Sequence, residues 1–195
     1  MKEFWNERFA QKNFVYGTEP NAFFRQEIDR LSPGHLLLPA EGEGRNAVYA
    51  AQKGWQVYAF DYAEAAREKA LQLAARRGVQ LQYELASYDE IQLPEAHFDA
   101  LALIYAHTEN WQHIYPRLFR ALRPGGTLIV ELFAPAQLGR PSGGPKQASL
   151  LVSAEALQAL LQDFSESRVW EEETFLNEGA YHHGEAAVTR AVAKR

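Results

Sequence analysis

The chain has 195 residues, of which 47% are hydrophobic, and this length suits one domain with a sizeable core. The formal net charge of −5 argues against a nucleic-acid-binding surface, and the absence of cysteine excludes disulfides, thiolate zinc sites and cysteine nucleophiles. No apolar run reaches the roughly 18–20 residues of a membrane span, and the charged, aromatic residues 1–8 do not resemble a signal peptide. We therefore expect a cytoplasmic globular protein without a membrane or nucleic-acid partner.

The first 31 residues predict two short helices. Phe4, Trp5 and Phe9 give the first helix an apolar side. Pro20 and Asn21 are typical of a helix start, and apolar residues at helical spacing follow them.

Strands and helices then alternate along the chain. Such alternation predicts an α/β fold in which a parallel sheet carries helices on both faces. The expected strands lie at 35–39, 55–60, 79–84, 98–105 and 126–133, and the expected helices lie at 45–53, 63–76 and 110–122.

The last third of the chain differs in pattern. Residues 134–148 form a loop rich in Gly and Pro, and Ser153 is placed to cap a helix that ends at Leu161. Two strands are then expected, at 168–176 and 186–192. No helix separates them, so we expect an antiparallel hairpin at the edge of the sheet, joined through Gly179 and Gly184.

A glycine-rich turn lies between the first strand and the first helix of the alternating region. Gly42 and Gly44 permit a tight turn and close approach of a ligand, and Asp61 ends the next strand, where it can accept hydrogen bonds from a ribose. This βαβ pattern suits a nicotinamide dinucleotide and an adenosyl ligand alike. Asp61 could instead cap helix 63–76, with Glu64 completing a capping box.

Two acids in the turn favour one of these ligands. Glu41 and Glu43 would repel the pyrophosphate of a dinucleotide at close range. They would not repel S-adenosylmethionine, which has no phosphate and carries a sulfonium and an ammonium. The turn therefore favours S-adenosylmethionine.

A second motif supports this interpretation. A Leu-Arg-Pro-Gly-Gly turn at 122–126 precedes the fifth strand, and together with the glycine turn, Asp61 and the final hairpin it resembles class I S-adenosylmethionine-dependent methyltransferases. The resemblance implies a single Rossmann-like domain over 1–195, with seven strands in the order 3-2-1-4-5-7-6 and the last strand antiparallel. It implies a helical lid at 1–31, a cofactor-binding core at 35–133 and a substrate side at 134–195.

A narrower likeness is visible in four short segments, 16–21, 40–47, 143–146 and 178–182. They resemble small bacterial methyltransferases related to the tellurite-resistance and thiopurine methyltransferases. One departure from the broad family is clear: Leu38 stands where the first strand usually ends in an acid, and Ala40 replaces the first glycine. Glu41 is a candidate to contact the methionine ammonium instead.

The resemblance implies a set of cofactor-binding residues. Trp5 and Tyr16 would shield the sulfonium as part of the lid, although such aromatic residues commonly just pack helices onto a sheet. Ser87 would lie near the adenine, or it simply begins a loop. The complete set is Trp5, Tyr16, Glu41, Gly42, Gly44, Asn46, Asp61, Tyr62, Ser87 and Tyr105.

Further residues are candidates for the acceptor side. His107, after the fourth strand, and His183 are candidate general bases, while His107 could equally cap the next helix. Arg140 and Lys146 could meet an anionic substrate, although loop charges are usually solvated, and His182 is a further substrate candidate. No metal is expected.

The resulting hypothesis is an EC 2.1.1 enzyme that transfers a methyl group from S-adenosylmethionine to a small molecule. The resemblance suggests a thiol, a selenium or tellurium oxyanion, or another heteroatom nucleophile as acceptor. A nicotinamide-dependent oxidoreductase and an adenosyl-binding protein without turnover remain as alternatives. The sequence predicts no oligomeric state.

Overall fold

The computed structural model describes the backbone of residues 2–195 and side chains from residue 3 onward. No helix within that range combines the length and apolar character that crossing a bilayer requires. The helices are α1 Lys2–Phe9, α2 Ala22–Ile28, α3 Arg45–Gln52, α4 Glu64–Arg76, α5 Trp111–Phe119 and α6 Ala154–Leu160, with short 3-10 turns η1 Pro135–Gln137 and η2 Ala148–Leu150.

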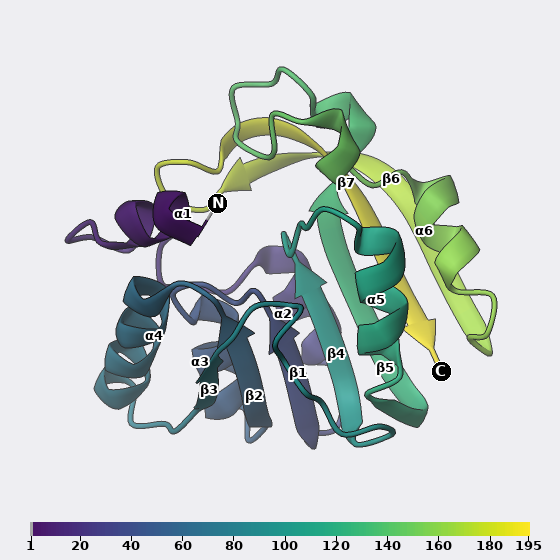
Figure 1. Ribbon diagram of the computed structural model, residues 1–195, viewed down its shortest axis with the longest axis horizontal. Coiled ribbons are helices and arrows are strands. Elements are labelled where there is room, and N and C mark those ends of the chain that lie inside the picture. Colours follow the sequence, from purple (N-terminus) through teal and green to yellow (C-terminus); the bar gives the residue numbers. More distant parts are fainter. Residues whose placement is uncertain (1) are drawn as a thin grey trace. The chain divides into compact units, whose positions relative to one another are not determined.

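The strands form one seven-stranded sheet in the order β3-β2-β1-β4-β5-β7-β6, which confirms the predicted order (Figure 1). Strand β7 runs antiparallel to its neighbours, as predicted. The strands are β1 His35–Pro39, β2 Gln56–Asp61, β3 Gln82–Leu85, β4 Phe98–Ile104, β5 Leu122–Phe133, β6 Glu166–Asn177 and β7 His183–Lys194.

The chain divides into two compact units, each described by itself below. Unit 1 comprises Met1–Gln92 and Glu178–Tyr181, and unit 2 comprises Leu93–Asn177 and His182–Arg195.

Unit 1 contains three parallel strands with α3 and α4 packed on them. Strand β2 pairs with β1 on one side and with β3 on the other. The helix predicted to start at Asn21 is confirmed, because the Asn21 Oδ1 accepts the Phe24 N–H at 2.8 Å. This helix buries Phe23, Phe24 and Ile28 and ends at Ile28.

Unit 2 holds the predicted hairpin, since β6 and β7 pair antiparallel along their whole length and β7 pairs with β5. Helix α6 starts as predicted, because the Ser153 hydroxyl accepts the Ala156 N–H at 3.1 Å. The strands of the hairpin are longer than expected, so that Gly184 lies within β7 and not in the connection.

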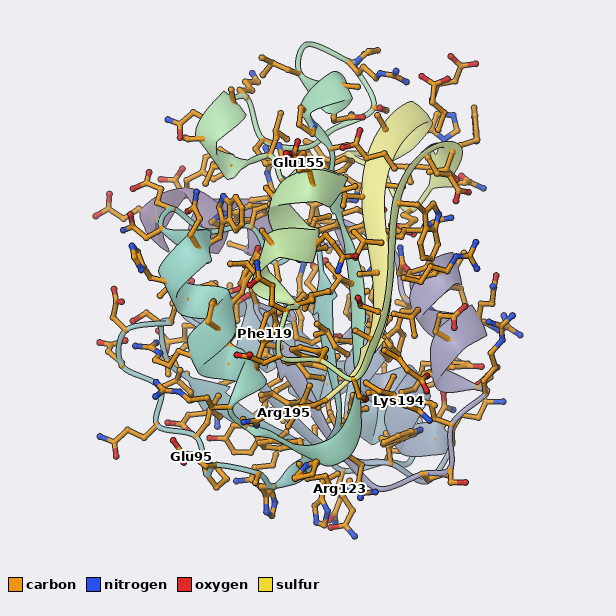
Figure 2. The ribbon with its side chains drawn as sticks, turned by 90° about the vertical axis from the view of Figure 1, so that its right-hand side faces the viewer. Glu95, Phe119, Arg123, Glu155, Lys194 and Arg195 are labelled. Carbon is orange, nitrogen blue, oxygen red and sulfur yellow. The ribbon has the colours of Figure 1, made fainter. Side chains whose placement is uncertain are left out.

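Two predicted boundaries in unit 2 were wrong. Helix α5 ends at Phe119, and β5 begins at Leu122 and continues through the Pro-Gly-Gly turn. Arg195 extends the start of β5 by pairing with it. The Gly125 N–H donates to the Arg195 carbonyl, and the Arg195 N–H donates to the Gly126 carbonyl. Figure 2 shows Arg195 beside Phe119 at the start of this strand, and its guanidinium donates to the Phe119 carbonyl at 2.9 Å.

Candidate functional site

The N-terminus of α3 is capped by a side chain from outside the helix. Its own N-cap residue, Gly44, has φ +85° and offers no side chain. Glu41 replaces the missing cap, because its Oε1 accepts the N–H groups of Asn46 and Ala47, each at 2.8 Å. The Asn46 side-chain amide also donates to Glu41 Oε2, at 3.3 Å. A carboxylate thus occupies the place where a helix N-terminus could bind a phosphate.

Burial of Glu41 has an electrostatic consequence. Burial raises the pKa of this carboxyl group to about 7, although the hydrogen bonds from Ala47 and Asn46 and the charge of Arg45 act in the opposite direction. A nearby cation would favour the ionised form. Glu41 therefore suits a turn that faces a cationic ligand better than one that faces an anion.

Both glycines of the turn have conformations that favour glycine. A Cβ at Gly44 would lie 2.6 Å from the Cβ of Ala70, so α3 and α4 could not pack as closely with any other residue. Gly42 has φ +64°, and its N–H donates to Asp61 Oδ2 at 3.1 Å. The turn and the end of β2 are thereby tied together.

Asp61 lies at the carboxyl end of β2 and is 8% exposed. Its Oδ1 accepts the Ala63 N–H at 2.9 Å. The alternative that Asp61 caps the next helix is wrong, because α4 begins at Glu64 with Ala63 as N-cap and no side-chain cap, so the capping box does not form. Burial raises the pKa of Asp61 to about 6. A carboxylate offers about four acceptor positions, which leaves capacity for a hydroxyl donor.

Glu43 joins the turn to the N-terminal segment. Its Oε2 accepts the N–H groups of Val15 at 2.7 Å and Tyr16 at 3.4 Å, and its Oε1 pairs with Lys69 at 2.7 Å. This role was not predicted, because the sequence places Glu43 in the turn without indicating its partners. The second acid of the turn therefore positions Tyr16.

Aromatic residues of the N-terminal segment gather beside the turn. Trp5 stacks on Phe9 with ring centroids 5.4 Å apart, and Tyr16 and Tyr62 pack in the same cluster. The Phe9 ring lies 3.3 Å from where a Gly42 Cβ would be. The structure thus brings together Trp5, Tyr16 and Tyr62, three of the predicted cofactor-binding residues.

Residues 178–181 complete this side of unit 1. Glu178 accepts hydrogen bonds from Arg45 at 2.9 Å and from the Asn21 amide at 2.8 Å. Asn46 accepts the Asn21 N–H at 2.9 Å, so Asn46 is bonded within the structure. A Cβ at Gly179 would lie 2.7 Å from the Tyr16 Cα. Two of the four segments that carry the narrower likeness, 16–21 and 40–47, therefore meet residues 178–181 of a third within unit 1.

Ser87 follows β3 and behaves as a loop start. Its N–H and hydroxyl both donate to Glu90 Oε2, at 2.9 and 2.7 Å. The preceding Ala86 N–H donates to the Asp61 carbonyl at 3.1 Å, which keeps Ser87 near the end of β2. Its role toward adenine stays a prediction.

In unit 2, Tyr105 follows β4 with a positive φ of 51°. Its hydroxyl donates to Glu131 Oε1 at 2.7 Å, and its ring stacks on Phe133 with centroids 4.7 Å apart. The His182 ring meets the Tyr105 ring edge-on, with centroids 4.7 Å apart. These contacts hold Tyr105 in a conformation that few non-glycine residues adopt.

His107 has both ring nitrogens engaged by backbone groups. Nδ1 lies 2.7 Å from the Leu150 carbonyl, and Nε2 lies 3.1 Å from the Phe133 nitrogen. The tautomer with hydrogen on Nδ1 satisfies both bonds. Burial lowers the pKa of His107 to about 4. The alternative that His107 caps the next helix is wrong, because Asn110 occupies the N-cap of α5.

The remaining acceptor-side candidates of unit 2 are spread among other partners. His182 is buried against Phe133, while His183 is exposed and its ring lies edge-on to Phe175. Arg140 pairs with Glu173 and donates to the Ala136 carbonyl, and Lys146 is exposed. Of the predicted acceptor-side residues, His107 and His182 join Tyr105 around Phe133.

A comparison with known families agrees with this geometry. Residues 37–130 match the profile of a family described as a methyltransferase domain. This stretch of the chain therefore resembles a methyltransferase domain. That match supports S-adenosylmethionine as the cofactor and methylation as the general activity. No curated protein matches the chain by sequence.

Solved structures share the fold of this chain at low sequence identity. A protein from a study of the conversion of a disulfide bond into a thioacetal group in echinomycin biosynthesis has a TM-score of 0.73 and 19% identity, covering 100% of this chain and 90% of that one. TehB from Haemophilus influenzae has a TM-score of 0.70 and 14% identity, covering 100% of this chain and 66% of that one. A Methanosarcina mazei S-adenosylmethionine-dependent methyltransferase has a TM-score of 0.65 and 17% identity, covering 91% and 98%.

Proposed function

We propose that this protein transfers the methyl group of S-adenosylmethionine to a small soluble acceptor through a soft heteroatom, as an enzyme of EC class 2.1.1. The observation that carries the proposal is the carboxylate of Glu41 on the N-terminus of α3. It takes the Asn46 and Ala47 N–H groups that a dinucleotide pyrophosphate would need. A ligand with an adenosyl group and no phosphate is compatible with this turn.

The residues of unit 1 fit such a ligand. Asp61 would accept ribose hydroxyls with its remaining acceptor positions, and the turn at Gly42 would allow the ligand to approach the backbone. Trp5, Tyr16 and Tyr62 would cover the ligand, where cation–π attraction contributes roughly 0.5–2 kcal/mol. Bound S-adenosylmethionine supplies a methyl group on a sulfonium, which is already a good leaving group.

The state of His107 points to the kind of acceptor. Its Nε2 lone pair already accepts a backbone N–H, and the lowered pKa makes it a weak base. His183 is exposed and remains the candidate base on β7. An acceptor that ionises readily, such as a thiol or a selenium or tellurium oxyanion, needs little base catalysis, so positioning and exclusion of water would supply most of the rate.

The narrower likeness to tellurite-resistance and thiopurine methyltransferases points the same way. The meeting of segments 16–21, 40–47 and 178–181 around Glu43 and Glu178 supports it. Under this proposal the partner is a small molecule in a bacterial cytoplasm, without nucleic acid or membrane.

Two alternative functions have less support than methyl transfer. A nicotinamide-dependent oxidoreductase would have to place its pyrophosphate against the Glu41 carboxylate. An adenosyl-binding protein without turnover would share the residues of unit 1, and only an assay separates it from an enzyme.

The test is a methyl-transfer assay with S-adenosylmethionine and a panel of thiols, selenite, tellurite, amines and phenols, followed by release of S-adenosylhomocysteine. We expect turnover with soft acceptors and its loss in Asp61→Ala. Asp99→Ala, which removes a surface partner of Arg123, is the control. Binding of S-adenosylmethionine without turnover on any acceptor would favour the non-catalytic alternative.

A further inference from the structure

Arg8 of α1 lies among aromatic rings from both ends of the chain. Its Cζ is 4.5 Å from the Phe4 ring centroid, 5.4 Å from that of Trp5 and 4.4 Å from that of Tyr181. These ring contacts stabilise the positive charge, but they offer no oxygen or nitrogen acceptor to the N–H groups.

Arg8 differs from two other cations of unit 1 in its partners. Arg45 is paired with Glu178, and Lys69 is paired with Glu43. Among the residues that the structure describes, no carboxylate forms an ion pair with Arg8. One of its five N–H donors goes to the Tyr16 hydroxyl, at 3.3 Å. The guanidinium therefore keeps donor capacity for a ligand.

Tyr181 adds a second donor to the same place. Its hydroxyl accepts a hydrogen bond from the Gln11 amide at 3.3 Å, which leaves the hydroxyl proton to be donated. The Tyr181 side chain is 38% exposed, so a small molecule can reach it. Arg8, Gln11 and Tyr181 thus form a cluster of donors, which we call the Arg8 cluster.

The Arg8 cluster adjoins the proposed cofactor site within unit 1. Trp5, which Arg8 contacts, stacks on Phe9, and Phe9 belongs to the same hydrophobic cluster as Ala63, two residues beyond Asp61. By contrast, Arg140, the arginine expected to meet an anionic substrate, is paired with Glu173. Arg8 is therefore a better candidate than Arg140 to meet an anionic substrate.

We propose that the Arg8 cluster binds the negatively charged oxygens of the methyl acceptor, a carboxylate or an inorganic oxyanion. A planar guanidinium can donate two parallel hydrogen bonds to such a group. This inference rests on the proposed function and adds the charge of the substrate to it. In the competing interpretation Arg8 only holds the aromatic rings of the N-terminal segment together.

The experiment is calorimetric titration of the protein saturated with S-adenosylhomocysteine. The probes are 3-mercaptopropionate, its neutral counterpart 2-mercaptoethanol, and selenite. We expect the carboxylate thiol to bind at least about tenfold more tightly than the neutral thiol, in line with hydrogen bonds to charged groups. Selenite tests whether an inorganic oxyanion is bound as well as a carboxylate.

Variants separate the two interpretations. Arg8→Met keeps an apolar stem and should remove the preference for the carboxylate thiol, while S-adenosylhomocysteine affinity changes less than about threefold. Tyr181→Phe removes only the hydroxyl and should weaken the preference to a smaller extent. Arg25→Met is the matched control, because Arg25 also lies over a tyrosine ring, that of Tyr49 at 5.6 Å, and it should keep the preference.

Equal affinity of the wild type for the two thiols, together with no binding of selenite, would overturn the inference. A preference that survives in Arg8→Met would overturn it too. Failure of the wild type to bind S-adenosylhomocysteine would instead overturn the proposed function, and the same titrations of the free protein would still decide whether the Arg8 cluster binds anions.

Discussion

The glycine-rich turn and the β5–β7 strand pair each bury a glutamate, and they balance its charge in different ways. Glu41 in the turn accepts N–H groups at the start of α3. Glu131 on β5, which is 1% exposed, pairs with Arg190 at 2.6 Å and accepts the Tyr105 hydroxyl. An acid balanced by backbone dipoles can still change its protonation and respond to a cationic ligand. The buried Glu131, paired with an arginine, acts as a structural element.

The largest effect should come from breaking the ion pair of unit 2. Arg190→Met removes the arginine that pairs with the buried Glu131, and it should lower the free energy of unfolding by roughly 3 kcal/mol. Urea denaturation measures this. Arg168→Met, which removes an arginine over the Trp170 ring, is the control and should cost much less.

A second substitution tests whether the loss of stability in Arg190→Met comes from the buried charge of Glu131 or from lost packing. The double variant Glu131→Gln with Arg190→Met should recover part of the lost stability, because the buried charge of Glu131 is removed together with its partner. A double variant as unstable as Arg190→Met alone would show that packing, and not the buried charge, explains the loss.

The next effect concerns the packing of the turn. Gly44→Ala should cost about 2–4 kcal/mol, because the new Cβ would overlap Ala70 and the residue has φ +85°. Gly78→Ala is matched in φ, at +69°, but has open space around it, so about 1 kcal/mol is expected. Equal losses of thermal stability in the two variants would contradict close packing of α3 on α4.

The titration of Glu41 should be visible in the pH dependence of stability. Its pKa is about 7 in the folded protein against 4.5 for an ordinary glutamate, so the folded state binds the proton more tightly. This contribution to the free energy of unfolding is present below about pH 4.5 and is lost as pH rises to about 7, by about 1–3 kcal/mol.

Glu41→Gln isolates this contribution. The variant keeps an acceptor for the α3 N–H groups but has no charge to titrate, so its stability should fall less between pH 4.5 and pH 7 than that of the wild type. Chemical denaturation at several pH values measures both. Parallel curves for the two proteins would show that Glu41 does not titrate in this range.

The smallest effect compares two ways of capping a helix. Ser153→Ala removes a local cap that the sequence predicts, and it should cost about 1 kcal/mol. Glu41→Ala removes a buried cap that lies outside the helix and should cost more, because the Asn46 and Ala47 N–H groups would then be buried without an acceptor. A smaller loss for Glu41→Ala than for Ser153→Ala would contradict this account.

Local patterns predicted most of the fold. Alternating apolar segments located the strands, and the resemblance to class I methyltransferases implied their order. The caps at Asn21 and Ser153 were readable because a cap and its helix are neighbours in sequence. The boundaries around residue 122 were wrong, because the strand there depends on Arg195 at the other end of the chain.

The candidate site was less predictable, because its contacts also join residues that are far apart in the sequence. The sequence placed Glu41 in the glycine-rich turn and Asp61 at the end of the next strand, but it did not show that Glu41 caps α3. The partners of Glu43, Glu178 and His107 are separated from them by 28, 133 and 43 positions, so no spacing rule reveals them. The sequence pointed to Glu178 only indirectly, because the Glu178-Gly179 pair belongs to a segment that carries the narrower likeness.

The most direct test of the central claim is calorimetric titration of the wild-type protein with S-adenosylmethionine and, separately, with NADH at the same ionic strength. Because Glu41 occupies the N-terminus of α3, we predict micromolar affinity for S-adenosylmethionine and no measurable binding of NADH. Binding of NADH as tight as that of S-adenosylmethionine would show that the turn accepts a pyrophosphate, and it would contradict the account.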